Sequence, residues 1–168
     1  MNAPVDMGTR ATAMLRVNGE EHAVKIDPLA SLAAVLREQF GLTGTKISCN
    51  AGDCGACTVL VNGKPVMGCQ TLAARVQGEV TTVEGLHGPI ADALRAAFIE
   101  EGAFQCGYCT SGQIVSCYGL VGRSDTLSDA ELAVLLSGNI CRCTGYAGII
   151  RAVRAAARAV RATTEKTI

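Results

Sequence analysis

Eight of the nine cysteines in this chain of 168 residues fall into two sets of four. The first set comprises Cys49, Cys54, Cys57 and Cys69. Its first three members have the C-x4-C-x2-C spacing of plant-type [2Fe–2S] sites, in which thiolates surround a cluster from one loop. Gly52 and Gly55 lie inside this loop, where glycine relieves the strain of a tight curl. The fourth cysteine follows after eleven residues, a shorter gap than is common, and the set predicts an iron–sulfur site.

The second set comprises Cys106, Cys109, Cys141 and Cys143, a C-x2-C pair and a C-x-C pair. Each pair precedes a segment of helical periodicity, and a helix N-terminus favours the negative charge of thiolates. A C-x-C pair suits a single tetrahedral zinc ion poorly, because two nearly adjacent residues must both reach it. Two irons relax that demand, since each pair can serve a different iron. The spacing favours iron–sulfur, with zinc as the alternative.

The cysteines are expected to be free thiols in a cytoplasmic protein. Residues 1–16 contain neither the apolar stretch nor the twin arginine of an export signal, and an odd cysteine count does not suit a disulfide framework. Fifteen basic residues balance fifteen acidic ones, so nucleic acid is not an expected partner. No apolar run reaches the roughly 18 residues of a membrane-spanning helix, so no membrane association is expected.

The first half of the chain predicts short strands around one helix. Asn18-Gly19 and Asn62-Gly63 are hairpin turn signals. The expected strands are 13–17, 22–26, 58–61, 65–67 and 80–83. Leu32, Val35, Leu36 and Phe40 recur at helical spacing, and Gly41 stands where a C-cap is expected. These elements predict a small α+β domain in which a mixed sheet packs on one helix.

The second half predicts four helices of roughly 10 to 15 residues that form a small bundle. Their apolar faces are Ile90, Leu94, Ala97 and Phe98; Ile114, Cys117, Tyr118 and Val121; Leu132, Leu135 and Leu136; and Ile149, Ile150, Val153, Ala157 and Val160. Ser128 and Glu131 form a capping box before the third. Residues 84–89 are the expected linker. We therefore expect domains at 13–84 and 85–162, with mobile termini at 1–12 and 163–168.

The other residues that could do chemistry are interpreted as structural. Cys117 lies on an apolar face and is expected in the core, and His22 and His87 have no metal-ligand spacing. Arg151, Arg154, Arg158 and Arg161 form a stripe along the last helix, expected to be a solvated face, with a docking stripe for another subunit as the alternative. We find no phosphate-binding glycine motif and no catalytic triad, so no substrate site is expected on this chain.

Three segments resemble the small iron–sulfur subunit of the xanthine dehydrogenase (molybdenum hydroxylase) family, in its separate-subunit bacterial form. They are CNAGDCGACTV from Cys49, QCGYCTSG from Gln105 and LSGNICRCTGY from Leu136. The resemblance runs from about Met14 to Val160, with the motifs in the family's order. It implies a plant-ferredoxin-like (β-grasp) N-terminal domain and a C-terminal four-helix bundle that also binds a [2Fe–2S] cluster.

The resemblance also implies cofactors, partners and residue roles. Cys49, Cys54, Cys57 and Cys69 would hold the cluster nearer FAD, and Cys106, Cys109, Cys141 and Cys143 the cluster nearer molybdenum. Gln105 would hydrogen-bond the pterin, with Cys143 on the same side. A large partner would bind molybdenum with molybdopterin cytosine dinucleotide, and a medium partner would bind FAD, in a dimer of heterotrimers. Single electrons would pass between molybdenum and FAD in a direction that this subunit does not fix.

Three positions depart from the family pattern: Ser48 replaces a common Gly, Asn50 a common acidic residue and Ser111 the usual Pro. Loss of a negative charge at Asn50 is expected to raise the potential of the nearby cluster. Two alternatives stay open, a freestanding ferredoxin-like carrier and a zinc-stabilised interaction module. Aldehydes, purines, N-heterocycles, carbon monoxide and aromatic CoA thioesters all remain possible substrates, because the pocket would belong to another chain.

Overall fold

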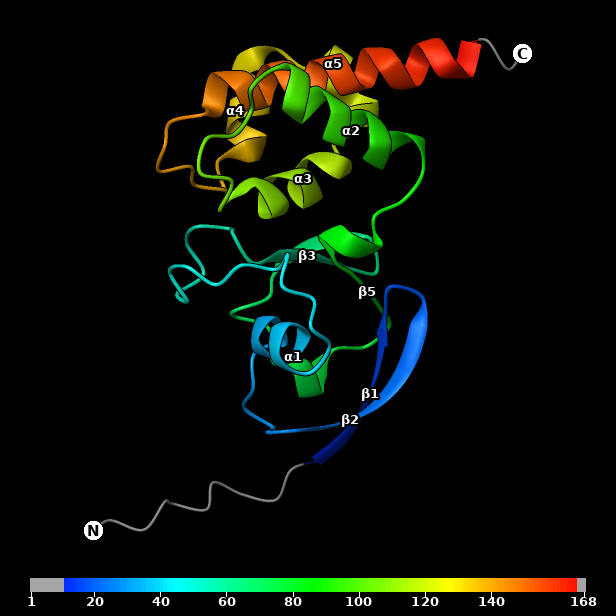
Figure 1. Ribbon diagram of the computed structural model, residues 1–168, viewed down its shortest axis with the longest axis vertical. Coiled ribbons are helices and arrows are strands. Elements are labelled where there is room, and N and C mark those ends of the chain that lie inside the picture. Colours follow the sequence, from blue (N-terminus) through cyan, green and yellow to red (C-terminus); the bar gives the residue numbers. More distant parts are fainter. Residues whose placement is uncertain (1–10, 166–168) are drawn as a thin grey trace.

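The computed structural model describes residues 11–165 and places a sheet below a layer of helices (Figure 1). The elements are β1 (Ala11–Val17), β2 (Glu20–Ile26), α1 (Leu32–Glu38), β3 (Thr58–Val61), β4 (Lys64–Met67), β5 (Glu79–Thr81), α2 (Pro89–Glu100), α3 (Thr110–Tyr118), α4 (Asp129–Leu136) and α5 (Tyr146–Glu165). Short 3₁₀ helices η1 (Ala73–Arg75), η2 (Val83–Gly85) and η3 (Val121–Thr126) lie between them. The predicted α+β class is confirmed.

The sheet is mixed and has the strand order β2-β1-β5-β3-β4. Both predicted hairpins form, and their Asn-Gly turns have positive φ at both residues, 52° and 88° in the first and 51° and 76° in the second. The central strand β5 runs parallel to β1 and antiparallel to β3. It ends before the predicted Val83, because the Thr82 N–H donates to Asn18 Oδ1 (2.9 Å) and leaves the ladder.

Helix α1 packs on the sheet and begins at a side-chain cap, where Ser31 Oγ accepts a hydrogen bond from the Ala34 N–H at 3.2 Å. The core between helix and sheet contains Leu15, Val17, Ile26, Leu32, Val35, Leu36, Val59 and Val80. The helix ends at Glu38 with Gln39 as its C-cap, two residues before the C-cap predicted at Gly41. Gly41 has a φ of +67° and turns the chain towards the first cysteine loop.

The four C-terminal helices share a second core, which contains Leu94, Phe98, Val115, Leu132, Ile149 and Val153. Leu60 of β3 joins this core, so α3 packs against the sheet as well as against its neighbouring helices. The capping box of Ser128 and Glu131 is confirmed, and Cys117 is fully buried as predicted. The helices have 12, 9, 8 and 20 residues, a wider spread than the sequence predicted.

The expected linker and termini contain more structure than the sequence indicated. Arg95 Nη2 donates to the carbonyls of Val83 (3.2 Å) and Leu86 (2.7 Å), which holds the expected linker against α2. Of the termini predicted to be mobile, Ala11 and Thr12 pair with β2, and residues 163–165 continue α5. Residues 1–10 and 166–168 lie outside the described residues. None of the described helices combines the length and the apolar character that crossing a membrane requires.

The arginine stripe on α5 was expected to be a solvated face, and this expectation is wrong for Arg154. Arg154 is only 23% exposed and donates to the carbonyls of Ser124 and, at 2.7 Å, Leu127. Its guanidinium also pairs with Asp129 at 2.7 Å, at the start of α4. This side chain therefore ties η3 and α4 to α5.

Replacing Arg154 by Met should lower the free energy of unfolding by about 2 kcal/mol, because two carbonyls and a carboxylate lose a charged donor. Arg158→Met, at an exposed position on the same helix, is the matched control and should stay within about 0.5 kcal/mol. Urea denaturation monitored by circular dichroism measures both. Equal losses of unfolding free energy in the two variants would contradict this stabilising role of Arg154.

Candidate metal centres

The first cysteine loop lies between α1 and β3 and directs backbone N–H groups at the exposed Cys49. Its Sγ accepts hydrogen bonds from Ala51, Asp53 and Cys54, each at 3.4 Å. These donors, Ala51 foremost, lower the pKa of Cys49 to about 6, so a thiolate is favoured near neutral pH. The curl depends on positive φ at Gly52 (84°), Gly55 (67°) and Asn50 (53°).

The other members of the first set lie deeper. Cys57 and Cys69 are 2% and 8% exposed and pack with Ala33, and the Cys69 N–H donates to Cys57 Sγ at 3.4 Å. Burial raises the pKa of Cys57 to about 11. Ionising such a thiol needs a positive charge beside it, and a bound metal ion supplies that charge. As predicted, the β3–β4 hairpin brings Cys69 back to the loop.

The second set gathers at the starts of α3 and α5. Cys109 is the N-cap residue of α3, and Cys141 and Cys143 lie on the loop before α5. Cys143 Sγ lies 3.5 Å from Cys106 Sγ, and the Cys141 thiol is near enough to Cys109 to help raise its pKa. Burial raises the pKa of Cys109 to about 12, whereas the Tyr108 N–H lowers that of Cys106.

These contacts bring cysteines of the two loops together, Cys143 with Cys106 and Cys141 with Cys109. The reason is the direction of the last two side chains. Cys141 is turned inward, 7% exposed, with its Sγ accepting from the Gly145 N–H at 3.4 Å. Cys143 is turned outward, towards the exposed Cys106.

Close pairs suit a centre with two metal ions. Two thiolates on one tetrahedral ion lie roughly 3.7 Å apart when metal–sulfur bonds are roughly 2.3 Å long. The paired thiols, some exposed and some buried, fit the two-plus-two ligand set of a [2Fe–2S] cluster in each loop region.

Direct hydrogen bonds join the two cysteine regions. The Ile140 N–H donates to the Cys54 carbonyl at 2.9 Å. Next to it, Asn139 Nδ2 donates to the Gly55 carbonyl at 2.8 Å, and the Tyr108 hydroxyl donates to the Ile47 carbonyl at 2.6 Å. Sequence reasoning missed these roles; the only signal was the position of Asn139 and Tyr108 beside cysteines.

Three further residues that the sequence analysis named, Gln105, Asn50 and Ser111, lie at these loops. Gln105 lies beside Cys143 and donates from Nε2 to its carbonyl at 2.8 Å, so the structure brings these two residues together. Gln70 Nε2 donates to the Asn50 carbonyl at 3.1 Å and lies 3.8 Å from Cys69 Sγ. Ser111 Oγ is buried without a hydrogen-bond partner at the start of α3.

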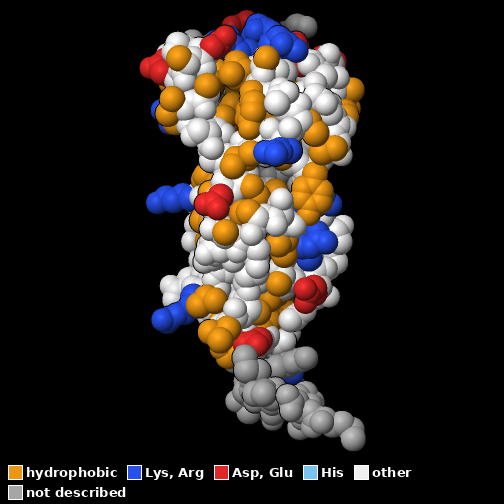
Figure 2. Space-filling model, turned by 90° about the vertical axis from the view of Figure 1, so that its left-hand side faces the viewer, with side chains coloured by type: hydrophobic (Ala, Val, Ile, Leu, Met, Phe, Trp, Pro, Cys, Tyr) orange, Lys and Arg blue, Asp and Glu red, His pale blue; other side chains and the backbone are white. Residues whose placement is uncertain are grey.

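The face that carries these loops is seen in Figure 2, where hydrophobic side chains gather over the helical part. Phe104, Tyr108, Ile140 and Tyr146, all near the second cysteine set in the sequence, are each 43–47% exposed. Apolar side chains concentrated in this way are typical of surfaces that another protein covers.

Gly55→Ala should remove the metal of the first set. A Cβ there would lie 2.3 Å from the Gly138 carbonyl and 2.6 Å from Asn139 Nδ2, in addition to the strain at φ +67°. Gly63→Ala is the matched control, because it has φ +76° but nothing within 4 Å of its Cβ. Iron analysis per chain should show the loss only in Gly55→Ala. Full iron in that variant would contradict the close approach.

Two family models match the chain. A 2Fe-2S iron-sulfur cluster binding domain matches residues 6–92, and a [2Fe-2S] binding domain matches residues 82–154. A probable xanthine dehydrogenase subunit of Bacillus subtilis is 46% identical, with 82% of this chain and 80% of that protein covered. The nicotinate dehydrogenase small FeS subunit of Eubacterium barkeri is 44% identical, with 86% and 94% covered.

Solved structures of related oxidoreductases have the same fold. A chain of quinoline 2-oxidoreductase from Pseudomonas putida superposes with a TM-score of 0.82 at 40% identity, with 92% of this chain and 98% of that chain covered. The aldehyde oxidoreductase of Desulfovibrio gigas matches with a TM-score of 0.80 at 38% identity, over 91% of this chain and 17% of that much longer chain. The chain belongs to the small [2Fe–2S] iron–sulfur subunits of the xanthine dehydrogenase, or molybdenum hydroxylase, family.

Proposed function

We propose that this chain relays single electrons between the molybdenum centre and the FAD of partner subunits through two [2Fe–2S] clusters. Cys49, Cys54, Cys57 and Cys69 would hold one cluster, and Cys106, Cys109, Cys141 and Cys143 the other. Each cluster, when bound, accepts and gives up one electron. The relatives' names, among them nicotinate dehydrogenase small FeS subunit, support an oxidoreductase complex of several subunits.

The observation that carries the proposal is the hydrogen bond from the Ile140 N–H to the Cys54 carbonyl at 2.9 Å. Cys54 is a proposed ligand of one cluster, and Ile140 directly precedes Cys141, a proposed ligand of the other. The route between the two sulfurs therefore runs through covalent bonds and one hydrogen bond. Electrons tunnel more readily along such a route than across an empty gap, so the link suits a relay.

The side chains around each set would tune the clusters. Three N–H groups at Cys49 and the Tyr108 N–H at Cys106 stabilise negative charge on sulfur, which eases reduction. Cys57 is buried and Cys109 half-buried, so water has less access to the opposite side of each set. We infer that both clusters gain an electron without large rearrangement, since the ligands are held by backbone groups.

The arrangement of partners is part of the proposal. Gln105 and Cys143 would face the pterin, which places the second cluster nearer molybdenum and the first nearer FAD. Family models that meet at residues 82–92 support a ferredoxin-like (β-grasp) domain at 13–84 and a four-helix domain at 85–162. We propose a dimer of heterotrimers with a large subunit binding a molybdopterin cytosine dinucleotide and a medium FAD subunit, in the cytoplasm, where thiols stay reduced.

Cys106→Ser tests the relay. The purified complex carrying this variant should lose turnover with its natural acceptor, while the EPR signal of the first cluster remains after dithionite reduction. Cys117→Ala, which removes a fully buried cysteine outside both sets, should keep turnover and both signals. Turnover that survives Cys106→Ser with the second signal absent would show that electrons do not need the second cluster.

A further inference from the structure

The side chain of Gln70 lies across the start of the first cysteine loop. Gln70 directly follows Cys69, and its Nε2 donates to the Asn50 carbonyl at 3.1 Å and to the Cys69 carbonyl at 3.4 Å. The same nitrogen lies 3.8 Å from Cys69 Sγ, a hydrogen-bonding distance for sulfur. These contacts fix the orientation of the amide, because the opposite orientation would place its oxygen against two carbonyl oxygens.

The loop has room for this side chain because residue 52 is glycine. A Cβ on Gly52 would lie 2.9 Å from Gln70 Cγ, closer than two such carbons can pack. Gly52 and Asn50 both have positive φ, 84° and 53°. The Gln70 side chain therefore packs on the curl of the loop and donates to one of the residues that form the curl.

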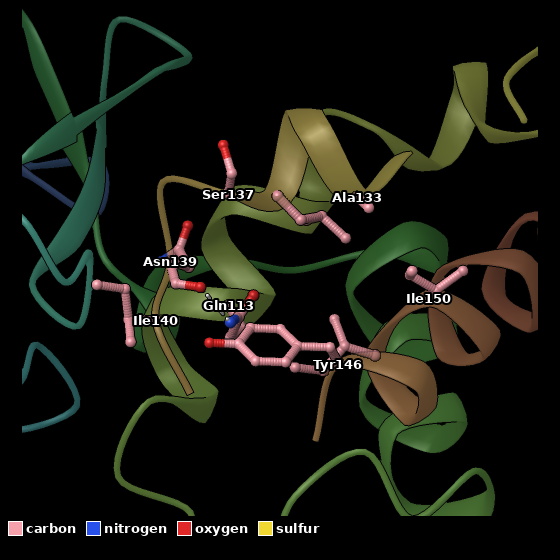
Figure 3. A pocket seen from close by; sticks show the side chains of 9 residues that line it. Gln113, Ala133, Ser137, Asn139, Ile140, Tyr146 and Ile150 are labelled. Atoms are coloured by element: carbon pink, nitrogen blue, oxygen red, sulfur yellow. Dashed lines mark hydrogen bonds between the residues drawn. The ribbon is translucent and has the colours of Figure 1, made fainter. Parts of the chain in front are cut away.

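The other end of the loop is held from the helical part of the chain. Asn139 Nδ2 donates to the Gly55 carbonyl at 2.8 Å, and the Ile140 N–H donates to the Cys54 carbonyl at 2.9 Å. Figure 3 shows Asn139 and Ile140 next to each other, beside Gln113, whose amide donates to the Asn139 carbonyl at 3.2 Å. The end of the loop is thus held by the helical part, and its start by an exposed glutamine.

The donor at Cys69 differs in kind from the donors at other sulfurs of the set. Cys49 Sγ accepts from three backbone N–H groups, and Cys57 Sγ accepts from the backbone N–H of Cys69. At Cys69 Sγ the donor is a side-chain amide. An N–H directed at a ligand sulfur stabilises the added negative charge of a reduced cluster, which raises its reduction potential. A substitution can remove this side-chain contribution without altering the backbone.

We propose that Gln70 is a positioning residue of the first cluster, whose amide holds Asn50 and Cys69 together and raises the reduction potential through its hydrogen bond to the Cys69 sulfur. The inference rests on the proposed function, in which the first set binds a [2Fe–2S] cluster. An electron distributes between two clusters according to the difference between their potentials. Gln70 therefore favours the electron on the first cluster, the one proposed to lie nearer FAD.

Two substitutions in the purified complex test this role. Gln70→Met keeps the length of the side chain but removes the donor, and should make one-electron reduction of the first cluster about tenfold less favourable, a fall of about 59 mV. Gln70→Glu removes the donor and adds a negative charge, and should lower the potential further. Both variants lose the contact to Asn50, so a purely structural role predicts equal shifts. A redox titration followed by EPR measures the potentials, and that of the second cluster should not change.

Gln77 provides the matched controls. Its side chain is exposed, and its backbone carbonyl accepts from Asn62 Nδ2 at the end of β3 opposite to Cys57. Gln77→Met and Gln77→Glu make the same chemical changes in the same half of the chain and should leave both potentials unchanged. A shift in Gln77→Glu as large as that in Gln70→Glu would overturn the local role of Gln70.

Iron analysis shows whether each Gln70 variant retains the first cluster. Wild-type potentials in Gln70→Met with both clusters present, or equal shifts in Gln70→Met and Gln70→Glu, would overturn the inference and leave the proposed function standing. A wild-type complex that lacks the first cluster would instead overturn the proposed function and the inference with it.

Pulsed EPR of the wild-type complex needs no variant, and it decides the question if the Gln70 variants lose the first cluster. With glutamine labelled by nitrogen-15 in the side-chain amide, the signal of the reduced first cluster should show a coupling to that nitrogen. Gln105, whose amide also lies beside a cysteine, is at the second set and would contribute to the other signal. A first-cluster signal without the coupling would contradict the hydrogen bond from Gln70 to the Cys69 sulfur.

Discussion

The contact between the two cysteine regions is the constraint on which the rest of the structure depends. Ile140 and Asn139 donate to the adjacent carbonyls of Cys54 and Gly55, at 2.9 and 2.8 Å. The Ile140 N–H reaches the Cys54 carbonyl only because the two backbone segments approach each other closely, and glycine permits this approach. A Cβ on Gly112 of α3 would lie 2.4 Å from the Gly55 carbonyl. The first loop, α3 and the loop before Cys141 are therefore fitted to one another, and the sheet and helices serve to hold them there.

Each cysteine set combines thiols that ionise readily with thiols that do not. The exposed Cys49 and Cys106 have N–H donors that lower their pKa values. The buried Cys57 and the half-buried Cys109 have raised pKa values, because removal from water disfavours the thiolate. A metal centre resolves this asymmetry, since its positive charge stabilises all four thiolates together. Membership of the [2Fe–2S] family leaves the zinc-stabilised interaction module without support.

Local signals predicted most of the fold. The Asn-Gly turns determine both hairpins, and the Ser128 capping box marks the start of α4, because each acts within a few residues. The end of β5 could not be predicted, since it depends on Asn18, which lies 64 residues away from Thr82 in the sequence. The interpretation of Arg154 was incomplete for the same reason: helical spacing gives its face but not the carbonyls of Ser124 and Leu127.

At the candidate site, spacing identified the cysteines and the motifs identified the family, but neither indicated how the side chains pair. The pairing of Cys106 with Cys143 depends on the directions of two loops that meet only in three dimensions. The roles of Asn139 and Tyr108 were also inaccessible, because both side chains donate to backbone carbonyls that no sequence pattern marks.

Iron and acid-labile sulfide per chain, measured on the purified complex together with EPR of the dithionite-reduced sample, test the central claim most directly. Two [2Fe–2S] clusters predict about four irons and about four sulfides per chain, with two distinct signals. About two irons with one signal, or zinc in place of iron at the second set, would contradict the relay through both cysteine sets.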